Sequence, residues 1–190
     1  MAYGGAPGCL RVRFWYNAPE MAPILDEKTL ELISHSQAQT QGLGRHLARF
    51  LRGGEVLGLE GDLGTGKTSL VQGIAWGLGV EGPVTSPTFT LIQEYPIPQG
   101  PVRRLYHVDL YRLEHPVEEV LGIGLDEILG APGTVTAIEW AERIEALLPE
   151  DRVWVHLAFL DHTKRVIRIR GRGQRAEELV REFRKALMAG

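Results

Sequence analysis

The chain has 190 residues, of which 44% are hydrophobic and 24% are charged, and its formal net charge is -3. This length and composition predict one globular domain with a sizeable core. The slightly negative balance argues against a protein that holds nucleic acid by bulk charge, although a local basic patch remains allowed. No apolar run approaches the roughly 20 residues of a membrane-spanning helix.

The single cysteine, Cys9, excludes an internal disulfide, and no Cys/His spacing typical of a metal site occurs. Both features fit a reducing compartment, so we expect a cytoplasmic protein. The N-terminal residues lack a continuous apolar segment, and a signal peptide is therefore not predicted. We expect residues 1–23 to form a loosely structured extension, with Met21 as an alternative start, and residues 24–190 to form a single domain.

Apolar periodicity predicts that strands alternate with helices from residue 30 onward. Strand-like segments lie, in chain order, at 30–33, 55–61, 84–97, 102–113, 133–140, 152–160 and 165–171. Helix-like segments lie at 36–51, 67–78, 116–129, 141–148 and 175–188. Ser34 or Ser36 can cap the first helix, and Gly53 can stop it. The turn at 96–101 favours a hairpin between its flanking strands. This alternation predicts a three-layer α/β fold.

The clearest motif is Gly61 to Thr68, GDLGTGKT, which matches the phosphate-binding pattern G-x-x-x-x-G-K-[ST]. Glycines let backbone N–H groups point at phosphate oxygens, and the next helix adds its positive dipole end. The pattern predicts that Lys67 contacts the β- and γ-phosphates and that the Thr68 hydroxyl reaches Mg²⁺. A chance match in a chain with 23 glycines is the alternative, but the position between a predicted strand and helix argues against it.

Two predicted strands end in a carboxylate, Asp109 and Glu139. A P-loop site needs an acid to hold or position the metal. Carboxyl ends of strands line the ligand crevice of doubly wound sheets, so we expect both acids at the site. A solvated strand end is the simpler interpretation for one acid taken alone, and two such acids in a P-loop chain favour a functional role.

Four segments in this order and spacing, GDLGTGKTSL, VTSPTFTLIQEY, YHVDLYRL and IEW, resemble the TsaE (YjeE) family. These are small bacterial ATPases that support threonylcarbamoyl-adenosine formation in tRNA. The resemblance covers roughly residues 30–170, and SPTFTL with DLYRL is more specific than the P-loop. It implies a three-layer P-loop NTPase-like fold with a mixed, mostly parallel central sheet flanked by helices. One departure is Ala141, where the family usually has proline.

The resemblance also implies which residues serve ATP or ADP and Mg²⁺. Lys67, Asp109 and Glu139 would be catalytic, and Thr68 and Glu139 would hold the metal. The loop 85–90 would be a switch-like segment near the γ-phosphate. The nucleotide-binding residues would be Gln37, Thr40, Asp62, Leu63, Gly64, Thr65, Gly66, Lys67, Thr68, Ser69, Ser86 and Thr88.

The partners that the resemblance implies are the TsaD and TsaB proteins, which carry out the carbamoyl transfer, while contact with tRNA would be indirect. Arg104 and Arg112 are the candidates for an arginine finger, but each has a surface ion pair as its simpler interpretation, so we expect slow hydrolysis by the isolated chain. The rival functions are a small metabolite kinase and a nucleotide-gated binding module. A kinase would need an arginine-rich lid, whereas residues 112–130 are acidic.

The segment 164–175 carries six basic residues and no acid. It could contact tRNA phosphates, or nucleotide through Lys164 or Arg165. Alternation of Arg168 and Arg170 with apolar residues instead favours a half-exposed strand with a solvated arginine face.

Histidines and aromatic residues near the predicted site have packing as their simplest interpretation. We expect His107 and His115 to be packed or hydrogen-bonded, and assign neither a role. The aromatic residues predicted to pack in the core or the hairpin, rather than to stack on bases, are Phe89, Tyr95, Tyr106 and Tyr111.

Overall fold

The computed structural model describes residues 28–189, so the predicted extension at 1–23 lies outside the described residues. The strands are β1 (Thr29–Ser34), β2 (Glu55–Glu60), β3 (Ile92–Pro96), β4 (Arg104–Asp109), β5 (Thr134–Glu139), β6 (Arg152–Phe159) and β7 (Arg165–Arg172). The helices are α1 (Gln37–Ala48), α2 (Lys67–Gly77), α3 (Pro116–Gly122), α4 (Leu125–Ile128), the 3₁₀ helix η1 (Ala141–Leu147) and α5 (Gln174–Ala189). Within this part of the chain no helix is both long and apolar enough to cross a membrane.

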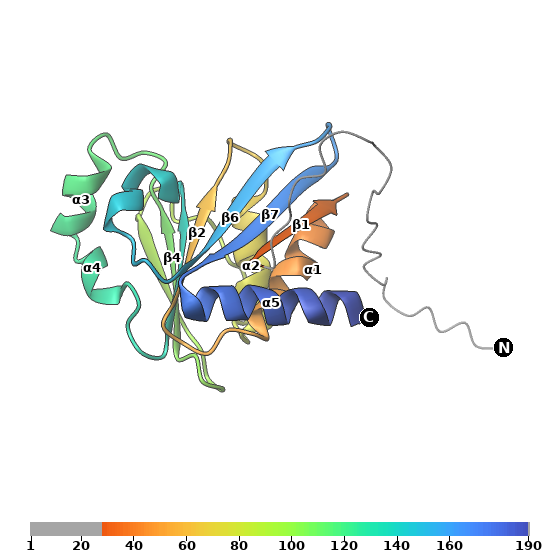
Figure 1. Cartoon of the computed structure of the whole chain (residues 1–190). Coiled ribbons are helices and arrows are strands. Elements are labelled where there is room, and N and C mark those ends of the chain that lie inside the picture. Colours follow the sequence, from red (N-terminus) through yellow and green to blue (C-terminus); the bar gives the residue numbers. More distant parts are fainter. Residues whose placement is uncertain (1–27, 190) are drawn as a thin grey trace.

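The strands form one sheet in the order β1-β7-β6-β2-β5-β4-β3 (Figure 1). The central strands β6, β2, β5 and β4 run parallel to their neighbours in this group. The outer pairings, β1 with β7, β7 with β6 and β4 with β3, are antiparallel. The predicted mixed sheet with a parallel centre is confirmed.

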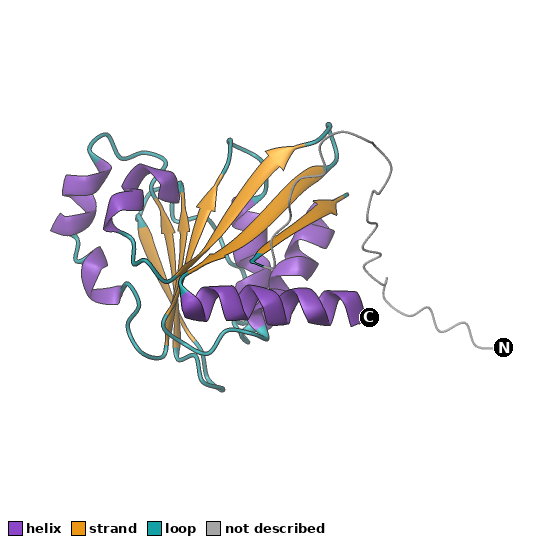
Figure 2. Ribbon diagram, in the orientation of Figure 1, coloured by secondary structure: helices purple, strands orange, loops and turns teal. Residues whose placement is uncertain are grey.

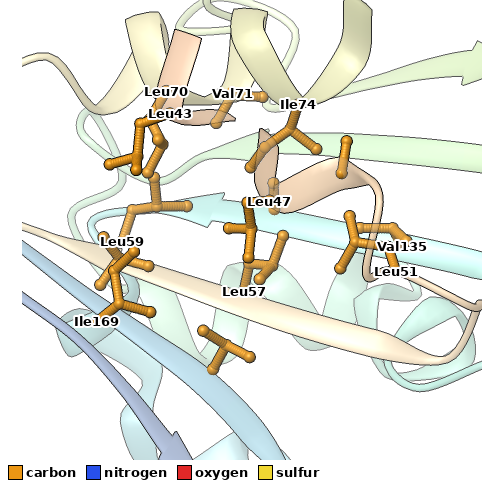
Figure 3. Close-up of a cluster of buried hydrophobic side chains, with 14 of the residues drawn as sticks. Leu43, Leu47, Leu51, Leu57, Leu59, Leu70, Val71, Ile74, Val135 and Ile169 are labelled. Atoms are coloured by element: carbon orange, nitrogen blue, oxygen red, sulfur yellow. The ribbon is translucent and has the colours of Figure 1, made fainter. Parts of the chain in front are cut away.

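Helices cover both faces of this sheet (Figure 2). Successive residues of a strand point to opposite faces, and β2 shows this directly. Leu57 and Leu59 join a core cluster that includes side chains of α1, α2 and α5, whereas Val56 joins a cluster with α3, α4 and η1. Figure 3 shows part of the first cluster, with Leu47 of α1 over Leu57 of β2, both fully buried. The sheet therefore forms the middle of three layers.

The first helix begins as predicted and ends earlier. Ser36 is its N-cap and accepts a hydrogen bond of 3.2 Å from the Gln39 N–H. The regular helix stops at Ala48, because the Leu51 N–H bonds to the Ala48 carbonyl at 3.3 Å in a tighter final turn. Gly53 follows with a φ of 100°, which turns the chain into β2. The predicted extension of the helix to residue 51 was wrong by this one turn.

Only the second half of the predicted β segment 84–97 forms a strand. From Ile92 onward it pairs with β4 in the predicted antiparallel hairpin. The preceding residues form a loop, because the Thr90 and Leu91 N–H groups bond to the Pro87 carbonyl at 3.0 and 2.7 Å. Leu91 has a φ of 64°, which lies outside the β region. This local hydrogen bonding overrides the β-branched composition of the segment.

The predicted helix at 141–148 is a 3₁₀ helix that is broken inside by Ile144, whose φ is -131°. Tertiary contacts override helical preference here. The Ile144 side chain is buried in the smaller core cluster. The Arg143 guanidinium donates hydrogen bonds to the carbonyls of Leu110, Tyr111 and Leu113, and so ties η1 to the segment after β4.

Helices α1 and α2 pack closely at Gly44. A Cβ atom there would overlap the Leu70 carbonyl oxygen and lie 2.8 Å from the Ile74 backbone nitrogen. We expect G44A to lower the free energy of unfolding by about 1–3 kcal/mol, because the backbone of α2 cannot yield without shifting. In the same helix, a Cβ at Gly42 would meet nothing within 4 Å. G42A should raise the free energy of unfolding by about 0.5–1 kcal/mol through helix propensity. Urea denaturation measures both values, and effects of the same sign would contradict this account.

Candidate functional site

A cleft of about 620 Å³ opens at the carboxyl ends of the parallel strands. The loop after β2 enters it, and β4 and β5 end in it with Asp109 and Glu139. Every predicted site residue except Asp62 lines this cleft. These residues are Gln37, Thr40, Leu63, Gly64, Thr65, Gly66, Lys67, Thr68, Ser69, Ser86, Thr88, Asp109 and Glu139. Asp62 contributes its backbone carbonyl to the loop instead, as an acceptor from Lys67 and Thr65.

The glycine loop has the backbone that its sequence predicts. Gly66, the residue before α2, has a φ of 104°, a left-handed conformation that favours glycine. At Gly61 a Cβ atom would overlap the carbonyl oxygen of Leu157 in β6, so the loop can lie against that strand only with glycine here. Within residues 28–189 no side chain caps the N-terminus of α2. The free N–H groups of its first turn are therefore suited to an anion.

Lys67 is buried at this helix start, with only 4% of its surface exposed. Its ammonium donates hydrogen bonds to the carbonyls of Gly61 (2.5 Å) and Asp62 (3.0 Å) and lies 4.0 Å from the centre of the Trp140 ring. Burial lowers the pKa of Lys67, and the nearby carboxylates, first among them Glu139, oppose that shift. The loop carbonyls and the indole thus fix a cation at the mouth of the phosphate loop.

The Thr68 hydroxyl and the Glu139 carboxylate meet directly. Thr68 Oγ1 lies 2.8 Å from Glu139 Oε1 and 3.0 Å from Oε2, and the carboxylate is buried. Hydroxyl and carboxylate oxygens are the hard donors that Mg²⁺ prefers, and Mg²⁺ takes its remaining ligands from water and substrate phosphates. Within residues 28–189 no cluster of three or more His, Cys, Asp or Glu side chains could hold a metal alone. The donor set therefore fits a metal shared with phosphates.

Asp109 anchors the predicted switch loop. Its Oδ2 accepts a short hydrogen bond from Ser86 Oγ and one of 2.6 Å from Thr88 Oγ1. Its Oδ1 accepts from the Tyr111 N–H at 3.0 Å. The two hydroxyls predicted to lie near the γ-phosphate are thus bonded to Asp109 in this structure. One buried acid therefore holds two residues of the loop at 85–90, Ser86 and Thr88.

Several residues of the cleft were not predicted. They are Ser34 and His35 before α1, Tyr111 after β4, and His162 and Thr163 in the turn between β6 and β7. Tyr111 packs on Trp140 with ring centres 5.1 Å apart. Only the turn DHTK had a local signal: Asp161 folds it by accepting from the Thr163 and Lys164 N–H groups at 2.8 Å, and these bonds lower the pKa of Asp161. The others depend on tertiary placement.

Neither candidate arginine finger lines the cleft. Arg104 stands at the start of β4, away from its carboxyl end, and pairs with Glu94 at 3.3 Å. The Arg112 guanidinium lies 4.2 Å from the ring centre of Phe89. Phe89 itself is 83% exposed, so its predicted packing in the core or hairpin was wrong. The reason is that Phe89 lies in the loop before β3 rather than in a strand.

The basic segment behaves mostly as the structural interpretation predicts. In β7, Ile167 and Ile169 are buried while Arg168 and Arg170 are exposed. Arg168 pairs with Glu31 of β1 at 2.7 Å. Arg165 is the member of this segment that lines the cleft.

Glu142 lies on η1, three residues after Glu139, in surroundings that disfavour the charged form of its carboxyl. Burial raises the pKa of its carboxyl, the charge of Glu60 adds to this, and none of the described residues forms a hydrogen bond with Oε2. A carboxyl whose pKa is raised by folding destabilises the fold once the pH exceeds its unfolded value of about 4.3, and has no such effect well below it.

We expect E142Q to raise the melting temperature at pH 7 and to leave it unchanged near pH 3. Calorimetry at both pH values tests this, with E118Q on exposed α3 as control; an equal gain at both would contradict it.

Residues 34–167 match the family model described as "Threonylcarbamoyl adenosine biosynthesis protein TsaE". The chain belongs to the TsaE family. The TsaE protein of Bacillus subtilis (strain 168), named for tRNA threonylcarbamoyladenosine biosynthesis, is 39% identical over 156 residues, which cover 82% of this chain and 94% of the relative. That of Nostoc sp. is 47% identical over 126 residues, covering 63% of this chain and 72% of the relative.

Structural comparison agrees with the sequence relatives of the TsaE family. The crystal structure of Bacillus subtilis YdiB superposes with a TM-score of 0.70 at 34% sequence identity, covering 84% of this chain and 96% of that one. The family resemblance and the fold class predicted from the sequence are therefore confirmed.

Proposed function

We propose that this TsaE-family chain binds ATP with Mg²⁺, hydrolyses it slowly, and acts in threonylcarbamoyladenosine modification of tRNA in the cytoplasm. The observation that supports the ATPase assignment is the contact of Thr68 with Glu139, at 2.8 and 3.0 Å, beside an uncapped helix N-terminus. The family names of the relatives support the pathway.

Each part of the site has a task in this proposal. The N–H groups of loop 61–66 and of the first turn of α2 bind phosphate oxygens, and Lys67 adds a point charge. Thr68 and Glu139 would hold Mg²⁺. The metal, when bound, neutralises charge on the phosphates as the terminal phosphoryl group is transferred to water. Asp109 is placed to order that water or the loop beside it.

The Asp109 contacts suggest how the chain senses its nucleotide. The Ser86 and Thr88 hydroxyls bond to Asp109 in this structure. A γ-phosphate near the loop would compete for these two donors, and hydrolysis would return them to the carboxylate. The conformation of the loop at 85–90 would then report the nucleotide state to a partner.

Hydrolysis by the isolated chain should be slow. Among the described residues, Arg165 is the one arginine lining the cleft, and its guanidinium stacks on Phe159 at 4.6 Å. An arginine finger that stabilises the charge on the transferred phosphoryl group raises the rate about 10³- to 10⁵-fold. A chain without such an arginine at the γ-phosphate should therefore hydrolyse ATP slowly. Single-turnover assays of the pure chain measure this, and fast hydrolysis without partners would contradict it.

The proposed partners are TsaD and TsaB, and one experiment separates the three candidate functions. Tagged chain is loaded with ATP or ADP, TsaD–TsaB is captured, and phosphate release is followed in parallel. Nucleotide-dependent capture with phosphate release supports the auxiliary ATPase. Capture without release would indicate a nucleotide-gated binding module. The kinase alternative predicts neither, and the acidic helices α3 and α4, with Glu118, Glu119, Asp126 and Glu127, lack the arginines of a phosphate lid.

A further inference from the structure

His107 lies inside β4, two residues before Asp109 and on the interior side of the two acids. It is fully buried in β4, and its Nε2 lies 2.8 Å from Glu139 Oε1. His107 precedes Asp109 by two residues, so their side chains share one face of the sheet. Asp109 is paired in register with Glu139 on β5. The imidazole therefore contacts the acid from inside the protein, on the side away from the cleft mouth.

The two ring nitrogens of His107 have different surroundings. Nδ1 is buried and has no hydrogen-bond partner among residues 28–189, whereas Nε2 faces the Glu139 carboxylate. An ionised carboxylate only accepts hydrogen bonds, so the tautomer that satisfies this contact carries its proton on Nε2. A buried nitrogen without a hydrogen-bond partner lowers the stability of the fold, so an apolar side chain would fill this space at lower free energy. Within the described part of the chain, the one hydrogen bond of the His107 side chain is to Glu139, and this points to a role toward that acid.

Two donors hold Glu139 in the structure. The Thr68 hydroxyl, which has one proton to donate, lies 2.8 Å from Oε1 and 3.0 Å from Oε2, and His107 Nε2 lies 2.8 Å from Oε1. Thr68 is also the residue assigned to the metal, so its hydroxyl cannot be the sole support of the carboxylate. His107 is the support that does not compete for the metal. Without it the Thr68 hydroxyl would be the one remaining hydrogen-bond donor to the carboxylate among residues 28–189.

We propose that His107 is a positioning residue that holds Glu139 in the orientation required for metal binding. This inference rests on the proposed Mg²⁺-dependent function. Outer groups that orient metal ligands typically contribute 10- to 100-fold in metal affinity or activity. His107 should therefore affect the metal-dependent part of nucleotide binding and leave the phosphate loop unaffected.

The test uses two amides that place their N–H groups differently. In H107Q the amide nitrogen can replace Nε2 and still donate to Glu139, whereas in H107N it lies near the position of Nδ1 and cannot reach. Calorimetry gives the Kd of ATP in EDTA and across a magnesium titration. We expect H107N to need about tenfold or more magnesium for half-maximal binding. Its metal-free ATP affinity should stay within about twofold of wild type, and H107Q should recover most of the loss.

Distinct results would overturn the proposal. Wild-type magnesium dependence in folded H107N would show that the ring only fills space, and an equal loss in EDTA would show general distortion of the site. H115N, at an exposed histidine beside α3, is the matched control and should change neither value. If ATP binding by the wild-type chain does not depend on magnesium, the proposed function fails, and the proposal for His107 fails with it. Measurement of the wild-type chain alone reveals that outcome, whereas failure of the His107 proposal alone is seen only in the variants.

Discussion

Replacing Lys67 with alanine is expected to weaken ATP binding by about 10- to 100-fold, because a charge-assisted hydrogen bond contributes about 1.5–3 kcal/mol. Lys67 is the buried cation of the cleft, and the groups that influence its charge are all acidic, among them Glu139, Asp109 and Asp62. Without Lys67 these carboxylates would repel a triphosphate. The loss should therefore be larger at low salt than at high salt.

K67R separates charge from shape in the same measurement. The guanidinium is broader than an ammonium, and the site gives Nζ two carbonyls and the face of Trp140 at close range. We expect K67R to recover little of the lost affinity. K185A, in a surface pair with Glu182 on α5, is the control and should bind ATP like wild type. Calorimetric affinity of K67A within about twofold of wild type would refute the phosphate site.

Much of the fold could be predicted because its elements have strong local signals. Ser36 caps α1 as its sequence position indicates, and the alternation in β7 correctly separates Ile167 and Ile169 from the exposed arginines. The errors occur where local backbone hydrogen bonds or tertiary side-chain contacts override the apolar pattern. The apolar pattern of the sequence does not predict that residues 85–91 form a loop, which bonds to Asp109 and to its own Pro87 carbonyl, rather than extend the strand.

The site divides in the same way. Position in the sequence alone places two groups of residues in the cleft. They are the glycine loop between a strand and a helix, and the acids at the ends of strands. His107 carries no such signal, because an isolated histidine in an apolar strand is compatible with simple packing. Its contact with Glu139 depends on the parallel pairing of β4 with β5, which brings together residues 32 positions apart in the chain. Strand register, which the sequence does not reveal, decides that contact.

E139A is expected to separate metal-dependent from metal-independent nucleotide binding. In the proposed function, the substitution takes away one metal ligand, and it also removes a buried negative charge that would repel the triphosphate. We therefore expect the affinity for ATP in EDTA to stay equal or to increase, while the gain on adding magnesium disappears. Phosphate release should fall by about 100-fold or more, the usual cost of deleting one group that stabilises transition-state charge.

E139Q distinguishes the charge from the hydrogen bonds in this prediction. E139A leaves the buried His107 without its acceptor, so it should lower the free energy of unfolding by about 1–3 kcal/mol. The amide oxygen of E139Q can still accept from His107 or Thr68, so this variant should be more stable than E139A yet equally poor in magnesium-dependent turnover. Parallel calorimetry, denaturation and phosphate release measure the three quantities. Magnesium-dependent turnover in E139Q at the wild-type rate would exclude Glu139 as a metal ligand, because a neutral amide cannot replace a carboxylate at a Mg²⁺ site without loss.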